Sequence, residues 1–103
     1  MKINIKTTNI ELTLGIKKAI EEKISSVGKF IPNVPVEAFV EIAKETKHHQ
    51  KGKIYCAEAN INLPGAVIRS EAKEDNIYKA VNEVKDELQR LLKKYKSKKF
   101  QDY

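Results

Sequence analysis

The longest regular pattern of apolar residues in the chain lies between Ile77 and Lys99. Its apolar side chains recur at intervals of four, three, four, three and four residues, the spacing of a single stripe on an α-helix. We therefore predict a C-terminal helix that buries one side against the rest of the protein. The predicted stripe consists of Ile77, Val81, Val84, Leu88, Leu91 and Tyr95. Asp75 or Asn76 is placed to cap this helix.

A shorter helix is predicted between Thr13 and Gly28. The hydroxyl of Thr13 can accept a hydrogen bond from the free backbone N–H groups at the helix start, and glycine commonly ends a helix. Its apolar stripe consists of Ile16, Ile20, Ile24 and Val27.

Four segments alternate between apolar and polar residues, the pattern of strands that bury one face. They are residues 2–8, 36–42, 54–63 and 66–73, and the Leu63-Pro64-Gly65 sequence predicts a tight turn between the last two. The residues predicted to face inward are Ile3, Ile5, Thr7, Val36, Ala38, Val40, Ile42, Tyr55, Ala57, Ala59, Ile61, Ala66, Ile68, Ser70 and Ala72.

These elements predict the order β-α-β-β-β-α. A crossover through a helix makes the first two strands parallel, and short connections make the later strands an antiparallel meander. Because each strand has a single apolar face, both helices should cover the same side of the four-stranded sheet. We expect an α+β two-layer sandwich, formed by one domain over residues 1–103.

Positive charge is concentrated toward the end of the chain. The formal net charge is +6, of which residues 1–75 contribute +2 and residues 76–103 contribute +4. Arg90 to Lys99 contains six basic residues and no acidic residue. This distribution favours a polyanionic partner. A single cysteine, Cys56, cannot form an internal disulfide, and neither a membrane-spanning run nor a signal-peptide pattern is found, so we expect a cytoplasmic protein without membrane contact.

Catalytic and metal-binding patterns receive no support. His48, His49 and Cys56 lack a second cysteine or the helical histidine spacing of a metal site, and Cys56 has no identifiable base. The glycines do not form a phosphate-binding loop. We expect no enzyme activity, no cofactor, no metal and no small-molecule substrate. Tyr78 and Tyr95 could stack on bases, but we interpret both mainly as structural residues, Tyr95 in the core and Tyr78 at its edge. The basic loop at residues 47–53 could contact phosphate, but we interpret it mainly as a solvated hairpin loop.

Two spaced motifs resemble the short ribosome hibernation-promoting factors and the related ribosome-associated inhibitor A. The first covers Asn9-Ile-Glu-Leu-Thr13 and continues to Lys29-Phe30. The second includes Asn76-Ile77-Tyr78 and Ala80-Val81, and continues through Arg90, Leu92, Lys94, Lys96 and Lys98. Together they extend over nearly the whole chain.

The resemblance implies a double-stranded-RNA-binding-like fold and a protein that binds the small ribosomal subunit. Members of this family occupy the channel used by messenger RNA and transfer RNA, and they inhibit translation on idle ribosomes. A monomer is expected away from the ribosome. By position, the resemblance implies contacts to ribosomal RNA from Lys23, Lys29, Arg90, Lys94, Lys96 and Lys98, to which the charge pattern adds Lys79, Lys85 and Lys93.

The chain departs from the family pattern at two places. Leu91 stands where many relatives have glutamine, and the chain ends soon after Lys99, as expected of a short form or of the N-terminal domain of a long form.

Two alternative functions stay open. They are a general duplex-RNA-binding module and a protein–protein regulator such as a sigma-factor modulator. The regulator would use the open face of the sheet around Phe39 and Val67.

Overall fold

The predicted order of elements is confirmed. The computed structural model describes residues 1–29, 31, 36–45 and 52–101, and for residues 98–101 it describes the helix backbone alone. The elements are β1 (Lys2–Thr8), α1 (Leu14–Gly28), β2 (Glu37–Lys44), β3 (Tyr55–Leu63), β4 (Ala66–Glu74) and α2 (Ile77–Gln101). Their ends lie within two residues of the predicted ones.

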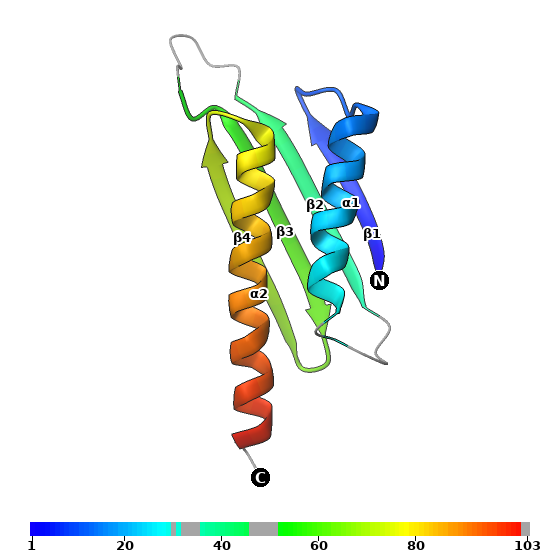
Figure 1. Cartoon of the computed structure of the whole chain (residues 1–103), viewed down its shortest axis with the longest axis vertical. Coiled ribbons are helices and arrows are strands. Elements are labelled where there is room, and N and C mark those ends of the chain that lie inside the picture. Colours follow the sequence, from blue (N-terminus) through cyan, green and yellow to red (C-terminus); the bar gives the residue numbers. More distant parts are fainter. Residues whose placement is uncertain (30, 32–35, 46–51, 102–103) are drawn as a thin grey trace.

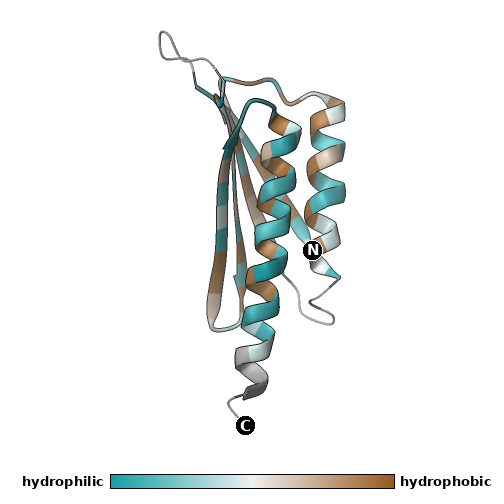
Figure 2. Cartoon of the chain, turned by 60° about the vertical axis from the view of Figure 1, so that its left-hand side comes forward, coloured by the Kyte–Doolittle hydropathy of each residue, from teal (hydrophilic) through white to brown (hydrophobic). Residues whose placement is uncertain are grey.

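The strands form one sheet in the order β1-β2-β3-β4. β1 is parallel to β2, and the β2–β3 and β3–β4 pairs are antiparallel. Both helices lie against the same side of the sheet, α1 beside β1 and β2 and α2 in front of β3 and β4 (Figure 1). The turned view shows the other side of the sheet without a covering helix (Figure 2). The predicted α+β two-layer sandwich is therefore confirmed.

The core lies between the helices and the inner face of the sheet. Ala38 and Ile42 of β2 and Ile61 of β3 are 0% exposed, as the alternation predicts. On α2 the stripe differs from the prediction near its end, where Leu92 is 0% exposed and Leu91 is only partly buried. Leu92 lies four residues after Leu88 and so continues the row that faces the sheet.

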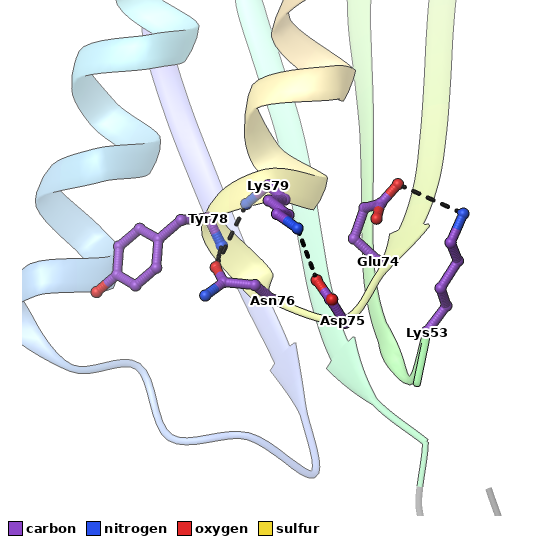
Figure 3. Close-up of polar contacts among 6 residues, drawn as sticks. All are labelled: Lys53, Glu74, Asp75, Asn76, Tyr78 and Lys79. Atoms are coloured by element: carbon purple, nitrogen blue, oxygen red, sulfur yellow. Dashed lines mark hydrogen bonds and ion pairs between the residues drawn. The ribbon is translucent and has the colours of Figure 1, made fainter. Parts of the chain in front are cut away.

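Side-chain caps begin both helices. Thr13 Oγ1 accepts a hydrogen bond from Ile16 N at 3.2 Å, as predicted. Of the two residues proposed to cap α2, Asn76 does so, because its Oδ1 accepts from Tyr78 N at 2.7 Å (Figure 3). Asp75 instead pairs with Lys79, with 3.2 Å between Oδ1 and Nζ. The cap sets the point at which α2 begins and thus the direction of its side chains.

Several residues considered for chemistry lie outside the described part of the chain. These are His48, His49 and the basic loop up to Lys51. In the part of the chain that the structure describes, no three histidine, cysteine or acidic side chains are grouped so as to hold a metal ion. Within the same residues, no helix combines the length and apolar character needed to cross a membrane.

Candidate nucleic-acid interface

The two helices meet along a seam that a polar contact marks. α1 and α2 run in the same direction side by side (Figure 1). The half-buried Lys23 of α1 donates a hydrogen bond from Nζ to Asn82 Oδ1 of α2 at 3.2 Å. Asn82 therefore identifies the flank of α2 that faces α1.

A row of polar and aromatic residues follows this flank of α2. Its members recur at intervals of four, three, four, four and three residues, so they share one side of the helix with Asn82. We call this row the seam stripe. It consists of Tyr78, Asn82, Lys85, Gln89, Lys93 and Lys96. The side chain of Lys85 is 19% exposed and pairs with Asp86, with 3.0 Å between Nζ and Oδ1.

A second row lies on the flank of α2 toward β4, and we call it the edge stripe. It consists of Glu83, Glu87, Arg90 and Lys94, spaced by four, three and four residues. Glu83 and Glu87 line a shallow hollow together with residues 69–72 of β4. Arg90 donates two hydrogen bonds to Glu87, at 2.9 Å from Nε and 2.6 Å from Nη2. The positive charge of Arg90 is thus shared with an acid one turn earlier on the same helix.

The edge stripe changes sign along its length. A hydrogen bond from Arg90 lowers the pKa of Glu87. Partial desolvation raises this pKa, and the charges of Arg90 and Lys94 lower it further. A hydrogen bond with Glu74 raises the pKa of Glu83, and desolvation and the charge of Glu74 act in the same direction. The edge stripe therefore begins with a carboxylate that Glu74 of β4 repels, Glu83, and ends with cations.

The residues predicted to bind RNA divide between these surfaces. Lys85, Lys93 and Lys96 lie on the seam stripe, and Lys23 contacts that stripe at Asn82, whereas Arg90 and Lys94 lie on the edge stripe. Lys79 lies four residues before Glu83, on the side of α2 that carries the edge stripe, and pairs with Asp75 (Figure 3). Lys29 is exposed immediately after α1, six residues beyond Lys23 and so toward the C-terminal half of α2. Lys98 lies on α2, but its side chain is outside the described part.

The open face of the sheet carries charges that compensate one another. Lys2 pairs with Glu37 at 3.7 Å, and Lys6 pairs with Glu41 at 3.9 Å. On β3 and β4, Arg69 contacts Glu58 at 3.0 Å and Glu71 at 3.9 Å, and Lys73 pairs with Glu45. Individual surface pairs add little stability, but their charges cancel at a distance. Among the residues that the structure describes, the excess of positive charge therefore lies on the helix side of the molecule.

Sequence reasoning missed two amide residues of this interface, Asn82 and Gln89. Their spacing from Lys85 is visible in the sequence, but amides carry no charge and did not enter the charge pattern. The seam stripe combines lysines with amides and an aromatic ring. This mixture is typical of surfaces that contact phosphates and bases together.

The family model described as "Sigma 54 modulation protein / S30EA ribosomal protein" matches residues 3–99 of the chain. The chain belongs to this family. The resemblance inferred from its sequence motifs is thus confirmed. The family description itself contains both the ribosomal and the sigma-factor label.

Curated relatives of this S30EA family member bear the name Ribosome hibernation promotion factor. The relative from Picosynechococcus sp. is 30% identical over 102 residues, which cover 97% of this chain and 51% of the relative. The one from Staphylococcus aureus is 28% identical over 98 residues, which cover 95% of this chain and 50% of the relative. The one from Deinococcus radiodurans is 24% identical over 90 residues, which cover 87% of this chain and 46% of the relative. The chain thus spans about half the length of the curated relatives it matches.

Solved structures share the fold. The N-terminal domain of Thermus thermophilus Protein Y superposes with a TM-score of 0.76 at 24% identity, covering 92% of this chain and 99% of that domain. A ribosomal subunit interface protein from Coxiella burnetii gives a TM-score of 0.73 at 23% identity, and the match covers 94% of this chain and 99% of that protein. These likenesses show that the fold of the chain, a four-stranded sheet with two helices on one side, is shared with both solved structures.

Proposed function

We propose that this protein is a ribosome hibernation factor. It binds the small ribosomal subunit through ribosomal RNA in the channel for messenger and transfer RNA, and so inhibits translation on idle ribosomes in the cytoplasm. The observation that carries the proposal is the charge asymmetry of the sandwich. The charges of the open face cancel in ion pairs, whereas the helix side keeps an excess of cations in addition to its own pairs of Lys85 with Asp86 and Arg90 with Glu87. The name shared by the curated relatives supports the same assignment.

The proposed action is occupancy rather than catalysis. Lysines that project from a rigid helix pair attract phosphates, and phosphate contacts release counterions from the RNA. Binding should therefore weaken steeply with added salt. A protein held across the decoding channel excludes messenger and transfer RNA by volume alone, without making or breaking a covalent bond.

The test is co-sedimentation with purified small ribosomal subunits at low and moderate salt. The seam variant carries glutamine at Lys85, Lys93 and Lys96. Its matched control carries glutamine at three open-face lysines, and so removes the same charge from the other side of the sheet. Those open-face lysines are Lys2, Lys6 and Lys73. A further variant, Arg90→Gln with Lys94→Gln, tests the edge stripe.

We expect the seam variant to be absent from the subunit fraction at moderate salt while the open-face control remains bound. The edge variant should weaken binding by less than the seam variant, because it removes two positive charges instead of three and two hydrogen bonds hold the charge of Arg90 against Glu87. If the seam variant and the control lose equal amounts of subunit binding, total charge decides binding. That result would overturn the assignment of the RNA-binding surface to the helix side. Competition with a long RNA duplex tests the alternative of a general duplex-RNA-binding module. That alternative predicts that the duplex releases the protein from ribosomes.

A second candidate function is protein–protein regulation through the open face. Phe39 is 42% exposed and Val67 is 62% exposed on that face, and the family description includes sigma-factor modulation. Phe39→Glu separates the two functions, because it alters the open face and leaves both helices unchanged. If Phe39→Glu still binds ribosomes and inhibits translation, the result supports the hibernation function. If it still sediments with subunits but no longer inhibits translation, the open face is needed for activity and the result supports the regulator.

A further inference from the structure

Tyr78 occupies an unusual position for a tyrosine in a helical seam. It begins the seam stripe and is 49% exposed, although its ring extends from the first turn of α2 toward α1 (Figure 3). A buried packing role requires less exposure than this. The ring therefore offers part of its surface to solvent at the same end of the seam where both helices begin (Figure 1).

The position of the Tyr78 ring is determined from two sides. Asn76 Oδ1 accepts a hydrogen bond from Tyr78 N at 2.7 Å, which fixes the backbone at the start of α2. On the opposite side, a Cβ added to Gly15 of α1 would lie 3.3 Å from Tyr78 Oη, so the hydroxyl end rests against the first turn of α1. Glycine at this position leaves room for the close approach. A ring held in this way loses little conformational entropy when a ligand stacks on it.

Charge along the same stripe indicates what would stack on the ring. Lys85, Lys93 and Lys96 follow Tyr78 on the seam stripe, and Lys23 contacts the stripe from α1 at Asn82. Lys85 is partly buried and pairs with Asp86, so Lys93 and Lys96 carry most of the accessible charge. At about 1.5 Å of rise per residue, the stripe from Tyr78 to Lys96 is about 27 Å long. An aromatic ring at one end of a line of cations matches a strand whose phosphates contact the lysines and whose base stacks on the ring.

We propose that Tyr78 is a stacking platform for one unpaired base, and that the seam stripe binds a single RNA strand rather than a duplex. This inference rests on the proposed function and specifies the class of RNA that the helix seam recognises. Bases in a duplex are already stacked and paired, so a duplex has no free base face for the ring. An unpaired strand supplies both the base and a continuous line of phosphates.

The amides of the seam stripe fit the same ligand. Asn82 lies between Tyr78 and Lys85, and Gln89 lies between Lys85 and Lys93. Amide side chains donate and accept hydrogen bonds to base edges and sugar hydroxyls, which an unpaired strand exposes. The stripe thus alternates groups that suit bases with groups that suit phosphates.

The test uses an oligouridylate on the order of ten nucleotides long, within the usual size range of single-strand sites. One position carries 2-aminopurine, whose fluorescence falls when the base stacks. The compared proteins are the wild type, Tyr78→Phe, Tyr78→Leu and the seam variant at Lys85, Lys93 and Lys96. Tyr78→Leu keeps an apolar side chain but removes the ring, and Tyr78→Phe keeps the ring.

We expect Tyr78→Leu to lower affinity for the oligonucleotide by roughly 5- to 150-fold and to abolish the quenching. Tyr78→Phe should bind and quench like the wild type. The slope of log affinity against log salt should not change in Tyr78→Leu, because stacking releases no counterions. In the seam variant that slope should fall by roughly 0.7 for each phosphate that the protein no longer neutralises.

Two results would overturn the inference. One is unchanged quenching and affinity in Tyr78→Leu, and the other is tighter binding of a hairpin duplex with the same number of phosphates. Co-sedimentation of the same proteins with small ribosomal subunits keeps the two proposals separate. Retained ribosome binding together with either result refutes the single-strand seam alone, whereas wild-type protein that fails to sediment refutes the proposed function itself.

Discussion

Arg90 and Glu87 form a two-point ion pair one turn apart on α2, with 2.9 Å from Arg90 Nε to Glu87 Oε2 and 2.6 Å from Nη2 to Oε1. The pair lies where the edge stripe changes from acidic to basic. An arginine held in this geometry presents less positive charge to a passing polyanion than an unpaired one.

Glu87→Gln is therefore expected to strengthen binding to small ribosomal subunits, by about two- to fivefold if Arg90 contributes what an exposed ion pair usually contributes. Affinity is measured by sedimentation at moderate salt. Glu21→Gln is the control, because it changes the net charge equally. Glu21 lies two residues from Lys23, so about 200° around α1 from the seam. Equal gains in both variants would show that net charge alone is responsible.

The same pair makes the stability of the fold depend on pH. Because the pKa of Glu87 is lowered in the folded state, its carboxylate stabilises the fold above the unfolded pKa. That contribution is lost as the pH falls through the folded pKa. The wild type should have a higher Tm than Glu87→Gln near pH 7, and the difference should close below about pH 4. Thermal unfolding followed by circular dichroism across this range measures it, and a pH-independent difference would contradict the pairing.

Glu83 should show the opposite sign. Its pKa is raised by the hydrogen bond with Glu74, by desolvation and by the charge of Glu74, so its ionised form is disfavoured in the folded state. Removing that charge with Glu83→Gln is expected to raise the Tm near neutral pH. The gain should disappear at acid pH, where Glu83 of the wild type is itself protonated. A lower Tm for Glu83→Gln at neutral pH would show that attraction to Lys53 and Lys79 dominates.

The core position of Leu88 predicts a large loss of stability on truncation. Leu88 is 0% exposed beneath α2, so Leu88→Ala leaves a cavity and should lower the free energy of unfolding by roughly 2–5 kcal/mol. Leu14→Ala is the matched control, since Leu14 is 86% exposed and its truncation should change stability by less than about 0.5 kcal/mol. Urea unfolding measures both, and comparable losses would contradict the packing of α2 on the sheet.

Much of the fold was predictable because its signals are local. The alternation in residues 36–42 and the helical spacing from Ile77 each determine a backbone period and a buried face without reference to the rest of the chain. The resemblance to the family was likewise carried by two motifs and confirmed over residues 3–99. The end of the α2 stripe was less predictable. Leu91 and Leu92 both suit an apolar stripe, and only packing against the sheet selects Leu92 for complete burial.

The order of the elements, the faces that they bury and the excess of positive charge near the chain end all follow from residue spacing and composition. Which cations share a surface depends instead on how the helices pack. The flank of α2 that faces α1 is identified by the contact of Lys23 with Asn82, two residues 59 positions apart. That contact, with the helical spacing, places Lys85, Lys93 and Lys96 on the same flank of α2 as Asn82 and leaves Arg90 with Glu87 on the other flank. A helical period relates residues along one helix, but the direction in which that helix faces depends on packing between distant segments.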